Sequence, residues 1–544
     1  MRRALSVTAA VALLTAVFSS PAHADAPDEF GTDWDDPISA VAPVERPDTD
    51  SCEVVLVDHV FDDFEPFESE YTPPAECAGD WSKVVLDLTG AVSGRQYDRM
   101  GTLTLGGVPV FNTSTPQPSP EGIEWQVEKD LTGYQALFRQ AQPVVMELGN
   151  LVDDVHNGVF DITVTVTFYA ADEHYPVSAT SDRVLPLDDA QRVGTDLVGS
   201  VTVPQNSVRL LADVYATGSG GGCEEFWYLT APPEAGYSCE SSDGPYREVQ
   251  VLVDGRVAGI AIPYPAVYTG GWSNPFLWYN VPAPRAFDLR PITYDLTPYL
   301  GLLNDGKAHE VTVRVAGVDA ETDGWATPTA FRVWQDHESS VVPGGLLSSN
   351  TTQLRNTWSV TVNGDETQII AEAGHQHTVT GWLETSDGRI LTTVDRVLTY
   401  SSTHAFGEAE NPDALGSNWR DVETRTVLAA SAEAEVRKTD RRYQIDGQIS
   451  LDDADRLTTS IVLHDNLISE ITSASQIVSK VHVNHGYLGK ASWTINVPRE
   501  ERDATGTSSV RFQVRWDAGS GNDACFDRHI RSRNGYVISD RQRC

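Results

Sequence analysis

The feature that most constrains the fold is an alternation of apolar and polar residues with a period of two. Residues 161–168 read Asp-Ile-Thr-Val-Thr-Val-Thr-Phe, so every second side chain is apolar and most are β-branched. This pattern places one set of side chains on each face of a strand, whereas a helix requires apolar residues every three or four positions. The pattern predicts strands here and at residues 81–88, 102–105, 144–148, 208–214, 248–253, 310–315 and 358–362.

Turn-forming pairs lie between or beside these segments. Glycine tolerates the backbone conformations that tight hairpin turns require. The pairs are Gly106-Gly107, Asp254-Gly255, Asp305-Gly306, Asn363-Gly364 and Asp387-Gly388. Short, regularly spaced strands are typical of antiparallel sandwiches. We therefore predict an all-β protein with two adjacent antiparallel jelly-roll sandwiches followed by a third β-rich region. The absence of a GxGxxG or Walker sequence argues against nucleotide chemistry.

Composition changes along the chain suggest the domain boundaries. Residues 1–24 combine two arginines, an apolar run and a small-residue end, which is typical of a secretory signal peptide. Residues 25–48 form a polar, Pro-rich leader. We place the N-terminal jelly roll at 49–175, the second at 176–338, a linker rich in Ser, Gly and Asn at 339–354, and a C-terminal β-rich region of unknown role at 355–544.

Charge and cysteine content agree with a secreted, extracellular protein. The net charge of −39 disfavours nucleic acid and anionic lipid as partners, and no mature segment is long enough to insert in a membrane. The cysteines are even in number, and we predict disulfides between sequence neighbours: 52 with 77, 223 with 239, and 525 with 544. No Cys-x-x-Cys or His-x-x-x-His spacing indicates a metal site, and we predict no cofactor.

Carboxylates are the remaining candidates for chemistry, and local context must select among 78 acidic residues. The first context is Gly94-Arg95-Gln96-Tyr97-Asp98-Arg99, where an acid lies between arginines just before a predicted strand. The guanidinium charges are expected to lower the pKa of Asp98 and keep it ionised as a base. A structural ion pair is the alternative, and the residues alone favour it.

Two further contexts contain an acid among apolar or aromatic residues. In the second, a Gly-rich loop leads through Cys223 to Glu224 and Glu225 and then to Phe226-Trp227-Tyr228. Aromatic faces bind sugar C–H surfaces, and burial beside them raises a carboxyl pKa toward the range of an acid catalyst. In the third, Glu147 interrupts an apolar strand, either as a group paired with Arg99 or as an outward-facing residue.

Several aromatic residues have weaker claims to a role in binding. Trp125 and, near the turn Gly270-Gly271, Trp272, Trp278 and Tyr268 are candidates for the lining of a glycan groove, or equally for the core.

A set of segments across about residues 50–336 resembles the plant-type peptide:N-glycanase A family. Individually these segments are weak signals, but together and in this order they are specific. They are Leu56-Val57-Asp58-His59 with Tyr71-Thr72-Pro73-Pro74, the 94–99 run, residues 122–130, residues 147–153, Glu225-Phe226-Trp227-Tyr228, Tyr246-Arg247-Glu248-Val249, residues 267–271, residues 274–278 and residues 293–298.

The resemblance implies an amidase that hydrolyses the glycosylated Asn side chain, giving aspartate and a glycosylamine, without a cofactor. A more distant likeness reaches the peptide:N-glycanase F type of two jelly rolls, whose essential acids correspond to Asp98, before Arg99, and to Glu225, two positions after Cys223. Tyr97 and Trp227 depart from that type's pattern. A third acid of the type would correspond to Glu147.

These residues define a hypothesis for the site. Asp98 activates water and Glu225 polarises the carbonyl or protonates the leaving nitrogen, with Glu147 as a third catalytic group. The substrate, an N-glycopeptide or glycoprotein, would be bound by Arg99, Trp227, Tyr228, Tyr268, Trp278 and Trp125. An endo-acting glycosidase would also use paired acids, and a non-catalytic glycan-binding protein would keep the aromatic residues. The sequence indicates neither an oligomeric state nor the accepted glycan type.

Overall fold

A computed structural model describes residues 33–218, 222–318, 324–429, 433–498, 501–518 and 523–544 of the chain. The predicted signal peptide and the start of the leader lie outside these ranges. The all-β prediction is confirmed, because antiparallel sheets form nearly all of the regular structure. The helical elements described are short: the α-helix α2 (Leu300–Leu303) and the 3₁₀ helices Ala75–Cys77, Thr132–Arg139, Trp227–Leu229, Pro233–Ala235, Pro275–Leu277, Thr297–Tyr299 and Glu408–Glu410.

The N-terminal domain consists of two four-stranded sheets, with the orders β1-β8-β3-β6 and β2-β7-β4-β5. Alternation in β8 buries Ile162, Val164 and Val166 while the residues between them face outward to differing degrees, which is the arrangement the sequence pattern predicts. The strands are β1 (Ser51–Phe61), β2 (Phe67–Tyr71), β3 (Trp81–Val92), β4 (Met100–Leu105), β5 (Val108–Ser114), β6 (Ile123–Asp130), β7 (Gln142–Glu147) and β8 (Phe160–Ala170).

The second domain contains a five-stranded sheet of order β10-β11-β17-β14-β15, a four-stranded sheet of order β16-β12-β19-β9, and the pair β13-β18. Long irregular loops connect several of these strands and carry candidate site residues. The strands are β9 (Arg183–Pro186), β10 (Asp188–Val193), β11 (Asp196–Val201), β12 (Ser207–Val214), β13 (Thr217–Gly218), β14 (Glu248–Val253), β15 (Arg256–Ala261), β16 (Ile292–Asp295), β17 (His309–Ala316), β18 (Trp325–Ala326) and β19 (Thr329–Gln335).

The C-terminal region forms one eleven-stranded antiparallel sheet, which we call the large sheet. Its longest strand, β22, has 20 residues and so extends for about 65 Å. The strands are β20 (Gly344–Thr351), β21 (Arg355–Asn363), β22 (Glu366–Thr385), β23 (Gly388–Phe406), β24 (Asp413–Ala429), β25 (Glu435–Leu451), β26 (Arg456–Ser473), β27 (Gln476–Thr494), β28 (Thr505–Asp517), β29 (Ala524–Arg533) and β30 (Tyr536–Arg543).

Part of the segment expected to be a linker, residues 339–354, belongs to this sheet. Strand β20 pairs with the second half of β22, from Thr351 opposite His377 to Gly344 opposite Leu383. Serine, glycine and asparagine signalled a flexible connection, but the backbone hydrogen bonds of an edge strand do not depend on apolar side chains.

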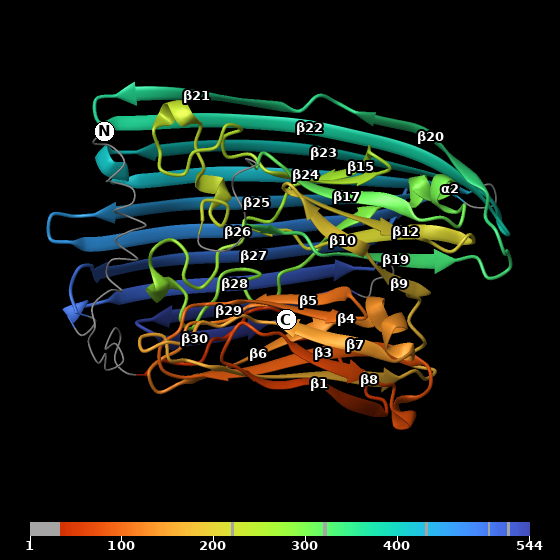
Figure 1. The fold of residues 1–544 in the computed structure, drawn as a ribbon, viewed down its shortest axis with the longest axis horizontal. Helices are drawn as coiled ribbons and strands as arrows, with labels where there is room; N and C mark the ends of the chain where they lie inside the picture. The colour runs from red at the N-terminus through yellow and green to blue at the C-terminus, as the bar shows by residue number, and fades with distance from the viewer. Residues whose placement is uncertain (1–32, 219–221, 319–323, 430–432, 499–500, 519–522) are drawn as a thin grey trace.

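The long strands cross behind the other sheets, and the second domain lies against one face of the large sheet (Figure 1). Trp278 is fully buried there and stacks on Tyr487 at 4.7 Å between ring centroids. Arg285 binds Asp465 through two hydrogen bonds of 2.6 and 2.9 Å. One continuous hydrophobic cluster includes buried residues from all three parts of the chain. The large sheet is therefore integral to the fold.

The three predicted disulfides are all present, joining Cys52 to Cys77, Cys223 to Cys239 and Cys525 to Cys544. Each closes a loop of no more than 25 residues along the chain. None of the helices in the described ranges combines the length and apolar character that a membrane-spanning helix needs.

Candidate active site

Asp98 lies in the loop between β3 and β4, at the boundary of the two N-terminal domains. The Gln117 amide, which follows β5, donates a hydrogen bond of 2.8 Å to Oδ1 of Asp98. The backbone of Gly270, in the second domain, also hydrogen-bonds this carboxylate. A Cβ at position 270 would lie 2.7 Å from Oδ1, so any larger residue there would displace the carboxylate. Both domains therefore contribute to the surroundings of Asp98.

The expected lowering of the Asp98 pKa by its arginine neighbours is wrong. Burial raises the pKa of Asp98, and this effect outweighs the opposing hydrogen bond from Gln117 and the charge of Arg99. Desolvation disfavours the charged form of any carboxyl group, and here the removal of water is the larger influence. Arg99 also donates to Oε1 of Gln96 at 2.9 Å, so its guanidinium turns back along the loop.

Glu225 lies in a loop fixed at several points. The Cys223–Cys239 disulfide closes this loop, and two turns follow each other, with N–H groups of Glu225 and Phe226 donating to the carbonyls of Gly222 and Cys223, both at 3.1 Å. The next turn is the 3₁₀ helix Trp227–Leu229. Glu225 remains partly accessible, whereas its neighbour Glu224 is buried.

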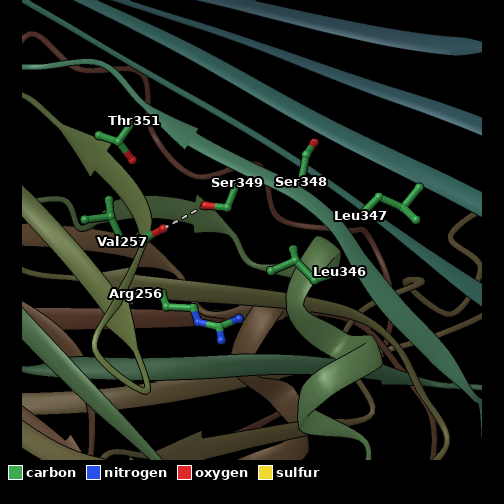
Figure 2. A pocket seen from close by; sticks show the side chains of 7 residues that line it. All are labelled: Arg256, Val257, Leu346, Leu347, Ser348, Ser349 and Thr351. Carbon is green, nitrogen blue, oxygen red and sulfur yellow. Dashed lines mark hydrogen bonds between the residues drawn. The ribbon is translucent and has the colours of Figure 1, made fainter.

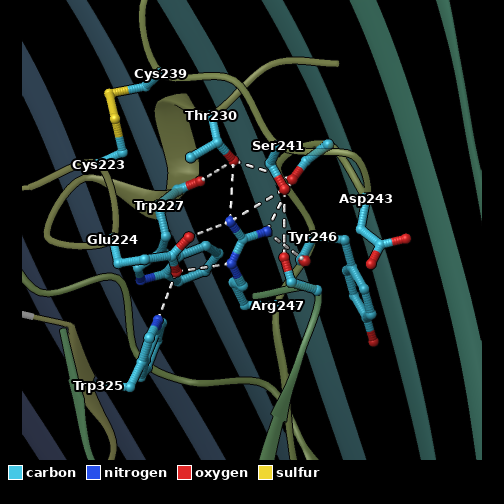
Figure 3. Close-up of polar contacts among 12 residues, drawn as sticks. Cys223, Glu224, Trp227, Thr230, Cys239, Ser241, Asp243, Tyr246, Arg247 and Trp325 are labelled. Atoms are coloured by element: carbon cyan, nitrogen blue, oxygen red, sulfur yellow. Dashed lines mark hydrogen bonds and ion pairs between the residues drawn. A yellow bond between two sulfur atoms is a disulfide. The ribbon is translucent and has the colours of Figure 1, made fainter. Parts of the chain in front are cut away.

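Glu224 is the anchor of this loop (Figure 3). It accepts hydrogen bonds of 2.6 and 2.9 Å from the fully buried guanidinium of Arg247, and a third of 2.5 Å from the indole of Trp325. A buried ion pair requires such additional hydrogen bonds to offset the desolvation of both charges. A Cβ at Gly218 would lie 2.0 Å from the carbonyl oxygen of Glu224, so β13 approaches the loop closely.

Tyr268 connects the two candidate acids. Its side chain is buried and its hydroxyl donates to the carbonyl of Gly218 at 3.0 Å. Burial raises its pKa, and the negative charges of Glu225 and Asp98 raise it further. The segment 267–271 therefore links the two loops, because Gly270 hydrogen-bonds Asp98 and Tyr268 binds Gly218, which packs against the backbone of Glu224.

The aromatic residues proposed to bind substrate are in fact buried, which does not fit an open sugar platform. Tyr228 and Trp278 are each 0 % exposed, and Trp227, Tyr268 and Trp125 are at most 5 % exposed. Packing explains this, because Trp227 lies against Trp419 of the large sheet and Trp125 lies against Phe160 inside the N-terminal domain. Of these residues, Tyr268 and Tyr228 lie near Glu225, since its charge contributes to raising the pKa of both hydroxyls.

Glu147 faces solvent at the end of β7, opposite Thr102 of β4. It therefore matches the outward-facing alternative, and the described contacts of Arg99 do not include it. Glu147 and Asp98 lie near the same sheet, because β7 pairs with β4 and β4 begins two residues after Asp98.

A hollow of about 530 Å³ between β15 and β20 is a separate feature (Figure 2). It contains none of the predicted site residues and no carboxylate, so it offers no acid or base. Its lining residues are Arg256, Val257, Leu346, Leu347, Ser348, Ser349 and Thr351.

Comparison with known proteins agrees with the resemblance noted in the sequence. Residues 41–348 match the family described as peptide N-acetyl-beta-D-glucosaminyl asparaginase amidase A. The chain is also 30% identical, over 404 residues, to the peptide-N4-(N-acetyl-beta-glucosaminyl)asparagine amidase A of Prunus dulcis, covering 68% of this chain and 69% of that protein. The chain belongs to the amidase A family.

The amidase A match ends within β20, so it covers both N-terminal domains and stops where the large sheet begins. Asp98, Glu225, Glu147 and Tyr268 all lie within it. The large sheet nevertheless supports the site, because Tyr237 of the Glu225 loop donates to Asp413 at 2.7 Å and Ser238 donates to Glu410.

Sequence reasoning did not predict the contacts that hold the candidate site in place. Gly270, Glu224 and Arg247 lie in or next to segments that carry the family resemblance, and Gln117 lies between two of them, but no spacing rule marks a residue whose partner is distant in the chain. The one available signal was the adjacent pair Glu224-Glu225, in which neighbours on an extended or turning backbone point to different environments.

Proposed function

We propose that this chain is an exported amidase that hydrolyses the side-chain amide of glycosylated asparagine in N-glycopeptides, releasing aspartate in the peptide and a glycosylamine. Membership of the amidase A family supports the reaction class. The observation that carries the site is the segment 267–271, because the Gly270 backbone hydrogen-bonds Asp98 while the Tyr268 hydroxyl binds Gly218, which packs against the loop of Glu224 and Glu225. Export rests on the N-terminal sequence pattern.

The reaction requires one proton acceptor and one proton donor. Asp98 accepts a proton from water as the new C–O bond forms at the amide carbonyl. Glu225 donates a proton to the nitrogen as the C–N bond breaks. The glycosylamine leaves, and proton exchange restores both acids. The hydrogen bonds from the Gln117 amide and the Gly270 backbone stabilise the ionised form of Asp98, which is the form that accepts a proton.

The test uses a defined glycopeptide and mass analysis of both products. Amide hydrolysis leaves aspartate in the peptide, whereas a glycosidase leaves Asn bearing one GlcNAc, and a glycan-binding protein leaves the substrate intact. Asp98→Asn and Glu225→Gln should each lower kcat by about 10²- to 10⁴-fold. Asp387→Asn, at an exposed turn of the large sheet, is the matched control and should retain full activity. Full activity of both site variants would contradict the proposal.

A further inference from the structure

Three large apolar side chains are exposed together beside the Asp98 loop. Phe64 is 66 % exposed, Leu151 44 % and Val152 40 %. They come from two connections, β1–β2 and β7–β8, and we call them the apolar patch. The Phe64 ring lies over Gly149, where a Cβ would be only 2.8 Å from its Cδ1, so the two connections touch. Single exposed apolar residues are ordinary, whereas a cluster marks a contact surface.

The buried residue Asn150 holds the two connections of the apolar patch together. The side chain of Asn150 donates to the carbonyls of Phe61 and Gly158, both at 3.0 Å, and its backbone N–H donates to Asp63 at 2.7 Å. Asn150 is 0 % exposed. The β1–β2 connection is therefore held against the β7–β8 connection by hydrogen bonds that solvent does not reach.

Gln96 attaches the same patch to the candidate active site. Its amide donates to the carbonyls of Leu151 and Gly158, at 2.9 and 3.0 Å, and it is only 4 % exposed. Gln96 precedes Asp98 by two residues. The apolar patch is therefore held next to the Asp98 loop.

The chemistry of the patch fits a peptide better than a sugar. Two of its three side chains, Leu151 and Val152, are branched aliphatic groups that offer no hydrogen bond to a hydroxyl and no flat face for a sugar ring. The third, Phe64, has an aromatic face, but the ring already lies against Gly149. Apolar peptide side chains gain by burial against such a surface. Exposed acids flank the patch residues along both connections and would attract a basic residue of a peptide. They are Asp62, Asp63, Glu65, Asp153 and Asp154.

We propose that the apolar patch binds the peptide on either side of the glycosylated asparagine, selecting sequences with apolar side chains and, at its rim, basic ones. This inference rests on the proposed amidase function. It names Phe64 and Leu151 as specificity-determining residues, outside the acid and base chemistry.

The experiment compares two substrates that carry the same N-glycan. One has a long peptide with Leu and Phe flanking the asparagine, and the other has only Gly and Ser neighbours. Phe64→Ser and Leu151→Ser should each raise KM for the apolar peptide by about tenfold, leaving kcat and the KM of the Gly/Ser substrate unchanged. Leu347→Ser, which alters a residue 60 % exposed on the large sheet, is the control and should change neither.

An equal rise in KM on both substrates would place the patch at the glycan and overturn the proposal, as would unchanged KM on both. Thermal melting checks that each variant keeps the fold. Fluorescence anisotropy with both labelled glycopeptides measures binding without turnover. Tighter binding of the apolar peptide that depends on Phe64 and Leu151 supports the patch even if the parent protein releases no glycan, in which case the amidase proposal alone fails.

Discussion

Burial and hydrogen bonding act in opposite directions on Asp98. Removal from water favours the neutral acid, while the Gln117 amide and the Gly270 backbone stabilise the ionised form. The balance leaves a raised pKa. Such a group is a competent proton acceptor only at pH values where it has lost its own proton, so its hydrogen-bond donors set the lower pH limit of the chemistry.

Gln117→Leu removes one of these donors and should raise the Asp98 pKa further. The acidic limb of kcat/KM would then move to higher pH, because a larger part of the enzyme holds protonated Asp98 at each acidic pH. The value of kcat/KM should fall about tenfold on the acidic limb and only slightly on the plateau. The measurement is the pH profile of glycan release from a glycopeptide.

The matched control is Gln376→Leu, since Gln376 donates to Asp395 at the same distance of 2.8 Å but on the large sheet. Its profile should coincide with that of the parent. If Gln117→Leu instead scales the whole profile without displacing its acidic limb, the amide stabilises structure only and does not tune Asp98.

Residue environment is hard to predict from sequence. The family resemblance proposes Asp98 and Glu225 as the acids, and the adjacent arginines predict a lowered pKa for Asp98, whereas burial raises it. The residues next to Asp98 in the sequence do not reveal how deeply it is buried, because part of its surroundings, including Gly270, comes from the second domain. For the same reason Trp278 was a candidate groove residue, yet the structure packs it on Tyr487, more than two hundred residues later.

At the level of elements, the loop that carries Glu225 depends on anchors at both ends. Glu224 is bound by Arg247 of the segment before β14, and Tyr237 near the other end is bound by Asp413 of β24. Two anchors and a disulfide limit the positions that the Glu225 carboxylate can adopt. A precisely held acid is worth more to catalysis than a mobile one.

Arg247→Met removes the ion pair with Glu224, the first anchor of this loop, and should destabilise the protein strongly. It leaves the Glu224 carboxylate buried with only the Trp325 donor, and loss of one partner of a buried ion pair costs about 3–5 kcal/mol. We expect the free energy of unfolding, measured with denaturant, to fall by that order. The double variant Glu224→Gln with Arg247→Met should recover part of the loss, because no uncompensated charge remains. Equal losses in the single and double variants would argue against the ion pair as the anchor.

Period-two patterns predicted strands well, and sequence neighbours predicted the disulfides. The segment 339–354 was misjudged as a linker because β20 is recognised by its pairing with β22 and not by its own composition. Pairing between distant strands is a property of the assembled sheet. The strand orders of the two N-terminal domains could not be read from the chain for the same reason.

At the scale of the whole molecule, the large sheet packs against the loops that carry the candidate site. It receives Trp227, Tyr237 and Trp278 from the second domain, and it forms ion pairs with that domain through Asp465 and His375. This gives a role to the region beyond the family match, for which the sequence offered only a β-rich prediction. It also makes the stability of the contact dependent on pH.

His375 of β22 carries this pH dependence. Its Nδ1 lies 2.9 Å from the Glu248 carboxylate of β14, and its Nε2 lies 2.9 Å from the carbonyl of Thr352, so both ring nitrogens donate in the protonated form. Although burial acts in the opposite direction, the hydrogen bond and charge of Glu248 raise the pKa of His375. Neighbouring His377 stays neutral, since burial and the His375 charge lower its pKa to about 4.

A raised pKa in the folded state means that protonation favours folding. The contribution of His375 is therefore complete below its ordinary pKa of 6.5 and disappears as pH rises through its raised pKa. We expect His375→Gln to lower the free energy of unfolding by roughly 1–3 kcal/mol at pH 6, with the difference from the parent shrinking toward alkaline pH. Urea unfolding across this range measures it. His337→Gln, which removes an exposed pair with Asp182, is the surface control and should change the free energy of unfolding little at any pH. A His375→Gln deficit that is constant with pH would show that packing, not charge, holds this contact.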